Sequence, residues 1–137
     1  MKSTKSGFGA KRRGKKVTVF RLGMIWVFKC FIGDEDLFRD LADYYKRDRY
    51  RFEFETMTER DDAASLLEQK GFSVDLVEDL NGYVVSMNKF DKYASILRNS
   101  VEFAETQDAR VFLMKNKVSV EEALDFGAEI YEGTIPF

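Results

Sequence analysis

The first residues of the chain that could do chemistry are glycines and cations near its N-terminus. Gly9, Gly14 and Lys15 have the GxxxxGK spacing of a phosphate-binding loop, in which backbone N–H groups and the lysine hold nucleotide phosphates. Such a loop also needs Ser or Thr after the lysine to bind Mg²⁺, and a strand before its first glycine. Lys16 and a polar tail occupy those places, so the segment does not predict a nucleotide-binding loop.

The same segment is strongly basic. Residues 1–16 carry seven cations and no acid, a charge of +7, whereas the other 121 residues carry 15 cations and 24 acids, a charge of −9. We call residues 1–16 the basic arm and expect it to be flexible. Its charge predicts salt-sensitive, sequence-independent contact with nucleic acid or another anion, although an arm that only adds solubility remains an alternative. The candidate anion-binding residues are Lys11, Arg12, Arg13, Lys15 and Lys16.

The rest of the chain offers little catalytic chemistry. It contains no histidine, which excludes Ser-His-Asp and Cys-His nucleophiles. The single cysteine, Cys30, lies in an apolar run and cannot form an internal disulfide. We therefore expect Cys30 to be a core residue with a raised pKa, in a protein of the reducing cytoplasm.

Acidic pairs are the remaining candidates for catalysis or metal binding. They occur at 34/36, 61/62, 78/79 and 121/122, and three of the four lie at expected helix N-termini, where the helix dipole accounts for them. We assign no catalytic residue, no metal ligand and no cofactor, and keep a small Mg²⁺-dependent carboxylate enzyme as an alternative. No uncharged apolar stretch approaches the ~20 residues of a transmembrane helix, so no membrane segment is expected.

Hydrophobic periodicity and turn residues predict an α+β domain over residues 17–137. The expected strands lie at 17–22, 24–32, 50–54, 72–79, 83–89 and 110–115, and the expected helices at 34–47, 58–70, 91–104 and 119–130. From 50 to 115 the order is strand, helix, strand, strand, helix, strand, with Asn81-Gly82 as a hairpin turn. This order predicts a ferredoxin-like (split βαβ) core with an added N-terminal strand-helix unit and a C-terminal helix, its helices covering one face of a sheet.

Aromatic and basic residues alternate from Tyr44 to Phe52, a composition that suits base stacking with cations on phosphates. Burial argues otherwise. If Tyr50 and Phe52 pointed to solvent, the charged residues between them would be forced under the helices at a cost of several kcal/mol. The aromatics are therefore expected to point inward, and the row Arg49, Arg51, Glu53 and Glu55 to form a solvated face.

The stretch from 24 to 32 is apolar on both faces of its strand. Trp26 and Phe28 fall on one face, and Ile25, Val27 and Phe31 on the other. One layer of helices covers only one face, and an exposed apolar face usually marks association. We therefore expect a non-enzymatic interaction or binding module that forms a homodimer or binds a protein partner through these five residues. Nucleic-acid binding through the basic arm is the alternative.

Overall fold

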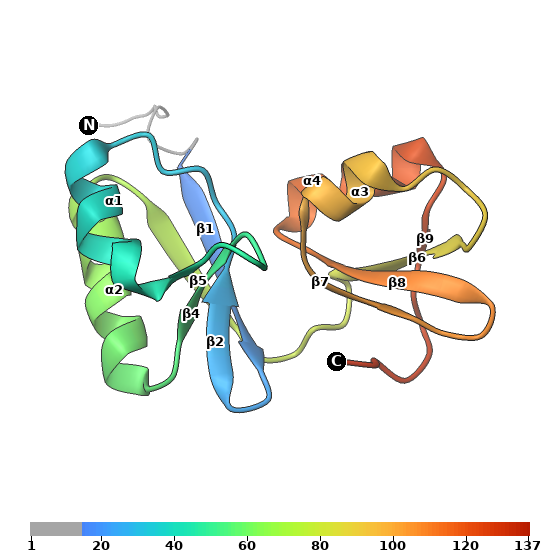
Figure 1. The fold of residues 1–137 in the computed structure, drawn as a ribbon, viewed down its shortest axis with the longest axis horizontal. Coiled ribbons are helices and arrows are strands. Elements are labelled where there is room, and N and C mark those ends of the chain that lie inside the picture. The colour runs from blue at the N-terminus through green and yellow to red at the C-terminus, as the bar shows by residue number, and fades with distance from the viewer. Residues whose placement is uncertain (1–14) are drawn as a thin grey trace, which may run out of the picture.

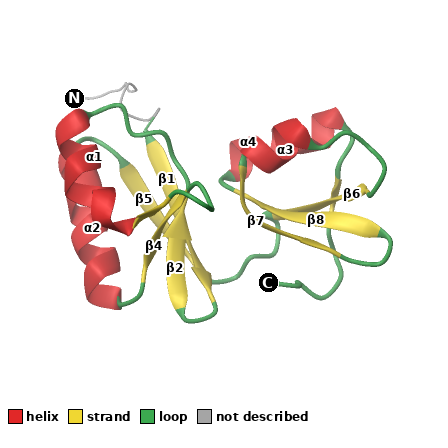
Figure 2. Cartoon of the chain, in the orientation of Figure 1, coloured by secondary structure: helices red, strands yellow, loops and turns green. Residues whose placement is uncertain are grey.

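The computed structural model describes residues 15–137 and shows a mixed α+β fold with two sheets and four α-helices (Figures 1 and 2). The first sheet has the strand order β3-β4-β2-β1-β5, and the second has the order β7-β8-β6-β9. The first half of the described chain comprises β1 (Lys16–Leu22), β2 (Ile25–Phe28), α1 (Glu35–Leu41), the 3-10 helix η2 (Ala42–Tyr44), β3 (Tyr45–Lys46), β4 (Arg51–Phe54), α2 (Met57–Gln69) and β5 (Ser73–Val77). The second half comprises β6 (Val84–Asn88), α3 (Ala94–Arg98), β7 (Ser100–Glu105), β8 (Ala109–Met114), α4 (Lys117–Phe126) and β9 (Glu129–Ile130).

Local signals in the sequence fix several of these boundaries. The Asp34 side chain accepts a hydrogen bond from the Leu37 N–H at 3.0 Å and caps α1. Gly71, with φ of 91°, ends α2, and the Phe72 N–H donates to the Leu67 carbonyl at 3.0 Å, as in a Schellman cap. The cap of α2 is Thr56, two residues before the start predicted for this helix at 58.

The predicted ferredoxin-like core over 50–115 is not confirmed, because its strands are divided between two sheets. β4 and β5 belong to the first sheet, whereas β6 and β8 belong to the second. β5 pairs with β1 in parallel, so the chain turns at Asn81-Gly82 to reach the other sheet and does not form a hairpin there. The predicted helix at 91–104 is confirmed only over 94–98: α3 ends at Arg98, and β7 follows it and pairs with β8.

Helices cover one face of each sheet. α1 and α2 pack on the first sheet around Phe28, Phe52 and Phe54, and α3 and α4 pack on the second around Phe112 and Val120. Figure 1 shows α1 and α2 at the outer left of the first sheet, and α3 and α4 above the second sheet.

A third apolar cluster joins the sheets. Phe20 and Val27 of the first sheet pack with Val84, Val111 and Leu113 of the second, and all five side chains are buried. The C-terminal residues Ile135 and Phe137 also pack against this cluster. The second face of β2, which the sequence predicted to be uncovered, is therefore covered by the second half of the same chain.

Candidate functional site: the cleft between the two sheets

Beside this apolar junction lies a cleft with a volume of about 960 Å³. Its first wall comes from the segment after β2 and from the β3–β4 hairpin, and its second wall from α3, β7 and the residue after β8. The lining consists of Lys29, Cys30, Phe31, Tyr45, Asp48, Arg49, Tyr50, Arg51, Phe52, Ala94, Leu97, Arg98, Asn99, Ser100, Val101, Glu102, Phe103 and Lys115. The volume is at the upper end of the range typical of small-molecule sites, roughly 300–1,000 Å³.

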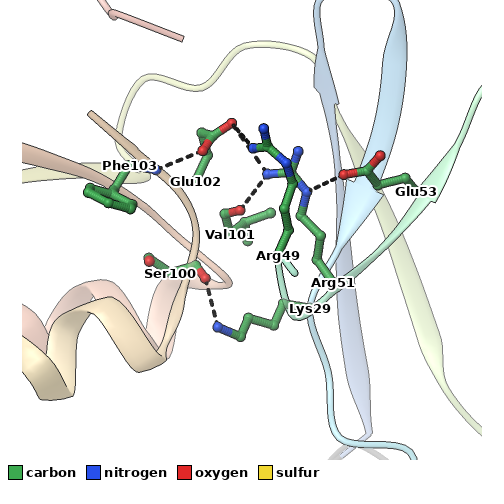
Figure 3. A network of polar contacts seen from close by, with 8 residues as sticks. All are labelled: Lys29, Arg49, Arg51, Glu53, Ser100, Val101, Glu102 and Phe103. Atoms are coloured by element: carbon green, nitrogen blue, oxygen red, sulfur yellow. Dashed lines mark hydrogen bonds and ion pairs between the residues drawn. The ribbon is translucent and has the colours of Figure 1, made fainter. Parts of the chain in front are cut away.

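A buried arginine crosses from one wall of the cleft to the other (Figure 3). Arg51, only 3% exposed, donates from Nη1 to the Val101 carbonyl oxygen at 2.7 Å and from Nε to Glu53 Oε2 at 2.8 Å. Glu102 Oε2 lies 3.4 Å from the Nη1 atoms of both Arg51 and Arg49. Two arginines and two glutamates thus balance in charge, which offsets the cost of burying the guanidinium group.

The backbone of β7 prepares it for these contacts. A β-bulge shifts the register with β8 between Ser100 and Glu102, and a bulge locally interrupts the regular ladder of hydrogen bonds. The carbonyl oxygens of Ser100 and Val101 accept hydrogen bonds from Lys29 Nζ, at 3.0 Å, and from Arg51. Side chains of the first sheet therefore bind main-chain acceptors at the irregular end of a strand in the second.

Burial changes the protonation chemistry on the first wall. Desolvation, with a smaller effect of the nearby Lys115 charge, lowers the pKa of Lys29 below its ordinary value of 10.5. Burial also raises the pKa of the Cys30 thiol, and the charge of Lys115 only partly opposes that shift. A thiol with a raised pKa is a poor nucleophile at neutral pH, in line with the expectation that Cys30 is not reactive.

Three exposed aromatic side chains line the cleft. Phe31, Tyr50 and Phe103 are 89%, 66% and 45% exposed, respectively. Phe103 stacks on Phe112 of β8, with ring centroids 6.0 Å apart and 22° between the planes. Phe112 packs with Ile96 and Val120 on the helix-covered face of the second sheet, so the Phe103 ring lies on that face and points away from Arg49 and Arg51 (Figure 3). The exposed rings of Phe31 and Tyr50 therefore supply the flat apolar surfaces of the first wall.

The charge of the lining is opposite to that of the body around it. Five cations and two carboxylates line the cleft, although residues 17–137 carry a charge of −9. Within residues 15–137, Arg98 and Lys115 form no ion pair with an acidic side chain. The cleft is therefore a local site of positive charge on an acidic domain.

Of the five predicted anion-binding residues, the structure describes Lys15 and Lys16. Lys11, Arg12 and Arg13 lie outside the described residues. Lys15 Nζ lies over the Phe72 ring, 5.7 Å from its centroid, and Lys16 forms an ion pair with Asp75 at 3.0 Å. That pair raises the pKa of the Lys16 ammonium group, and neither lysine lines the cleft.

Most of the predicted interface is inside the chain. Trp26 and Phe28 are buried under the helices, and Val27 is buried at the junction of the sheets, where half-buried Ile25 packs beside it. Of the five predicted residues, only Phe31 is largely exposed, and it lines the cleft. The uncovered face on which the predicted association rested is thus not present.

The expected solvated row on β4 also needs correction. Arg51 is buried and Glu53 is half-buried, because this face of β4 meets β7 of the second sheet. Phe52 and Phe54 point inward as predicted, but Tyr50 is exposed at the end of the β3–β4 hairpin. The signal that could have identified the cleft is the alternation of basic and aromatic residues from 44 to 52.

Comparison of the chain with known protein families, curated proteins and solved structures finds no match. Among residues 15–137 there is no group of three or more acidic or cysteine side chains placed to hold a metal ion. In the same part of the chain, no helix has the length and apolar character needed to cross a membrane.

Proposed function

We propose that this protein is a non-enzymatic binding module that takes an anionic ligand in the cleft between its two sheets. The observation that carries the proposal is the excess of cations in the lining, five against two carboxylates, within an acidic body. A concave site of one sign of charge concentrates ligands of the other sign and accelerates their binding.

The cations differ in what they can do for such a ligand. Arg51 and Lys29 already bind the carbonyl oxygens of Val101 and Ser100, so their main effect is to hold the walls together. Arg98 and Lys115, on the second wall, have no acidic partner within the described chain and are the cations best placed to bind an anion. Arg49 is half exposed and is paired with Glu102 at 3.4 Å, a long contact that leaves other guanidinium N–H groups for a ligand.

The basic arm extends the proposal toward nucleic acid. β1 and β2 are antiparallel, with Phe20 opposite Val27, so β1 begins at the end of the sheet where the chain leaves β2 toward Lys29 and Phe31 (Figure 1). The arm is therefore attached at the end of the sheet that borders the cleft, and a long polyanion in the cleft could also contact it. Deleting residues 2–16 should weaken binding of a long polyanion and make the remaining binding less sensitive to salt.

Association with a second copy or another protein remains a separate prediction. Its original support was an uncovered face of β2, and the second sheet covers that face. Light scattering across micromolar concentrations tests it: a concentration-dependent mass would support an oligomer, and a constant monomer mass would contradict it.

The experiment for the cleft uses inorganic polyphosphate, an anion without rings, and the full chain. The double variant R98E/K115E should strongly weaken the binding seen by calorimetry, because it reverses both unpaired cations of the second wall. The control is R39E/K92E, which makes the same change in charge at two exposed positions outside the lining. Equal binding by both variants would contradict the proposed function.

A further inference from the structure

The geometry points to single-stranded nucleic acid as the ligand of the cleft. This inference rests on the proposed function and makes it more specific: Phe31 and Tyr50 would stack on bases, while Arg49, Arg98 and Lys115 would bind phosphates. The two rings and Arg49 line the first wall of the cleft, and Arg98 and Lys115 line the second.

The exposed aromatic residues favour a ligand that has flat rings. An anion without rings would need only the cations, yet Phe31 and Tyr50 expose most of their surface to water beside them. Every nucleobase has two flat faces, and stacking on an aromatic side chain is tolerant of base identity. Exposed rings among unpaired cations therefore match a ligand that alternates flat bases with phosphates.

The backbone conformation of Tyr50 also supports a ligand that stacks on its ring. Its φ of 57° is the only positive φ of a non-glycine residue in the described chain. This left-handed conformation is uncommon for residues other than glycine and is tolerated best by Asn and Asp. Because the Tyr50 side chain is mostly exposed, packing within the chain does not account for an aromatic residue at this costly position.

The arrangement of the cations distinguishes a strand from a single nucleotide. Arg49 lies on the first wall, whereas Arg98 and Lys115 lie on the second. One phosphate group could bind the cations of one wall, whereas several consecutive phosphates could bind the cations of both walls. The basic arm is attached at the same end of the sheet and supplies further cations for a longer ligand.

A duplex fits the site less well than a single strand. In a double helix the base faces are stacked on one another and paired, so aromatic side chains cannot reach them without unstacking. Unpaired bases can be splayed apart and stacked on protein rings. The exposed rings of the cleft thus favour a single strand over a duplex of the same charge.

The test measures fluorescence anisotropy of labelled single strands of about ten nucleotides, within the range of site sizes known for single-strand-binding domains. Oligothymidylate and oligouridylate serve as the DNA and RNA probes. Removal of one stacking side chain should weaken binding by about fivefold or more. The variants are F31A and Y50N; the asparagine removes the ring but suits the left-handed backbone, so loss of binding is separated from loss of folding.

The matched control is F90A. Phe90 is 94% exposed and does not line the cleft, so its removal should change neither strand binding nor folding. Polyphosphate binding should be the same in F31A, Y50N and the parent protein, because these variants keep all the cations. A thermal melt of each variant confirms that its fold is retained.

The possible outcomes separate the inference from the proposed function. Strand binding that is unchanged in F31A and Y50N would overturn the inference, and so would a duplex or a mononucleotide that binds as tightly as the strand. In each of these cases, polyphosphate binding that depends on Arg98 and Lys115 would leave the proposed function in place. Absence of both polyphosphate and strand binding would overturn the two together.

Discussion

Arg51 in β4 donates to the carbonyl oxygen of Val101 in β7 at 2.7 Å, and this contact joins the two sheets within the lining of the cleft. The guanidinium group also binds Glu53 on its own strand, and Glu102 lies 3.4 Å away on the other sheet. Because a planar guanidinium group has several donors in fixed directions, one side chain can hold both walls at a defined angle. The shape of the cleft therefore depends on a residue that is itself buried.

Replacing Arg51 should destabilise the protein strongly. Arg51→Met fills much of the same space but leaves the half-buried Glu53 carboxylate and the Val101 carbonyl without their partner. We expect the free energy of unfolding to fall by about 3 kcal/mol, as for other buried ion pairs that lose one member. Urea denaturation followed by the fluorescence of Trp26, the single tryptophan, measures this change.

The control for Arg51 is its exposed neighbour in the same network. Arg49→Met removes only the 3.4 Å contact with Glu102, and exposed ion pairs contribute about 0–1 kcal/mol. Equal losses of stability in the two variants would show that Arg51 does not hold the sheets together. Addition of Glu53→Leu to Arg51→Met should restore part of the stability, because the carboxylate is then removed as well.

The N-terminus of α1 should confer pH dependence on the stability. The Leu37 N–H, and then the Lys70 ammonium group, hold the pKa of Asp34 below its ordinary value of 3.8. A lowered carboxyl pKa stabilises the folded state above the unfolded value, and the contribution is lost as the pH falls through the folded pKa. Asp34→Ala should therefore lower the urea midpoint at neutral pH, and its difference from the parent protein should shrink in acid.

Asparagine at the same position is the matched control, since it is also a good N-cap residue. Asp34→Asn should keep the hydrogen bond from Leu37 but lose the attraction to Lys70 and the dependence on pH. Its urea midpoint should lie between those of the parent protein and Asp34→Ala at neutral pH. A difference between parent and Asp34→Ala that is constant from neutral pH to pH ~3 would contradict this account of the cap.

Local features of this fold could be predicted from the sequence because neighbouring residues determine them. The Asp34 cap, the helix end at Gly71 and the inward side of Phe52 and Phe54 all depend on contacts within a few residues or on simple alternation. The short range of these interactions makes them independent of which strand lies next in the sheet. They are therefore recoverable without knowledge of the topology.

Pairing between strands could not be predicted in the same way. β5 contacts β1, more than fifty residues earlier, and nothing in its own sequence distinguishes that partner from β6. Residues 91–104 have apolar side chains at a spacing that fits a helix, yet Val101 and Phe103 also alternate with Glu102, as in a strand. The hydrogen bonds of β7 with β8 favour the strand over the helix, and residues 91–104 alone do not reveal that pairing.

The cleft could not be predicted from the sequence either, because distant segments of the chain form it. A charged residue on a strand of alternating polarity is expected to be exposed to solvent. Arg51 is buried because Val101 and Glu102, about fifty residues later in the chain, pack against it. The alternation of cations and aromatics from 44 to 52 identifies one wall of the cleft. The second wall, with Arg98, Phe103 and Lys115, has no comparable sequence signal, because its residues are separated by a helix end and two strands.

The C-terminal tail should contribute to stability. Ile135 and Phe137 pack on the cluster that joins the sheets, and both are half-buried. Ile135→Ala should lower the free energy of unfolding by about 1–2 kcal/mol, below the range for fully buried isoleucines. The exposed neighbour Thr134→Ala is the control, and an unchanged urea midpoint for Ile135→Ala would show that the tail does not stabilise the junction.

Lys29 should titrate below the other lysines, and Lys115 should account for part of the difference. Burial is the larger cause of its lowered pKa, followed by the Lys115 charge. In the folded state the charged form is therefore disfavoured, and the cost of keeping Lys29 protonated disappears as the pH rises through its folded pKa toward 10.5. An NMR titration of the Lys29 side chain measures this pKa directly.

Lys115→Ala should raise the pKa of Lys29 while leaving it below 10.5, because the desolvation remains. Lys92→Ala, at an exposed position outside the cleft, should leave it unchanged. Polyphosphate bound in the cleft should raise the pKa further, since a nearby anion favours the ammonium form. A Lys29 that titrates at or above 10.5 in the free protein would contradict the burial of its ammonium group between the walls, and a pKa unmoved by polyphosphate would place the bound anion elsewhere.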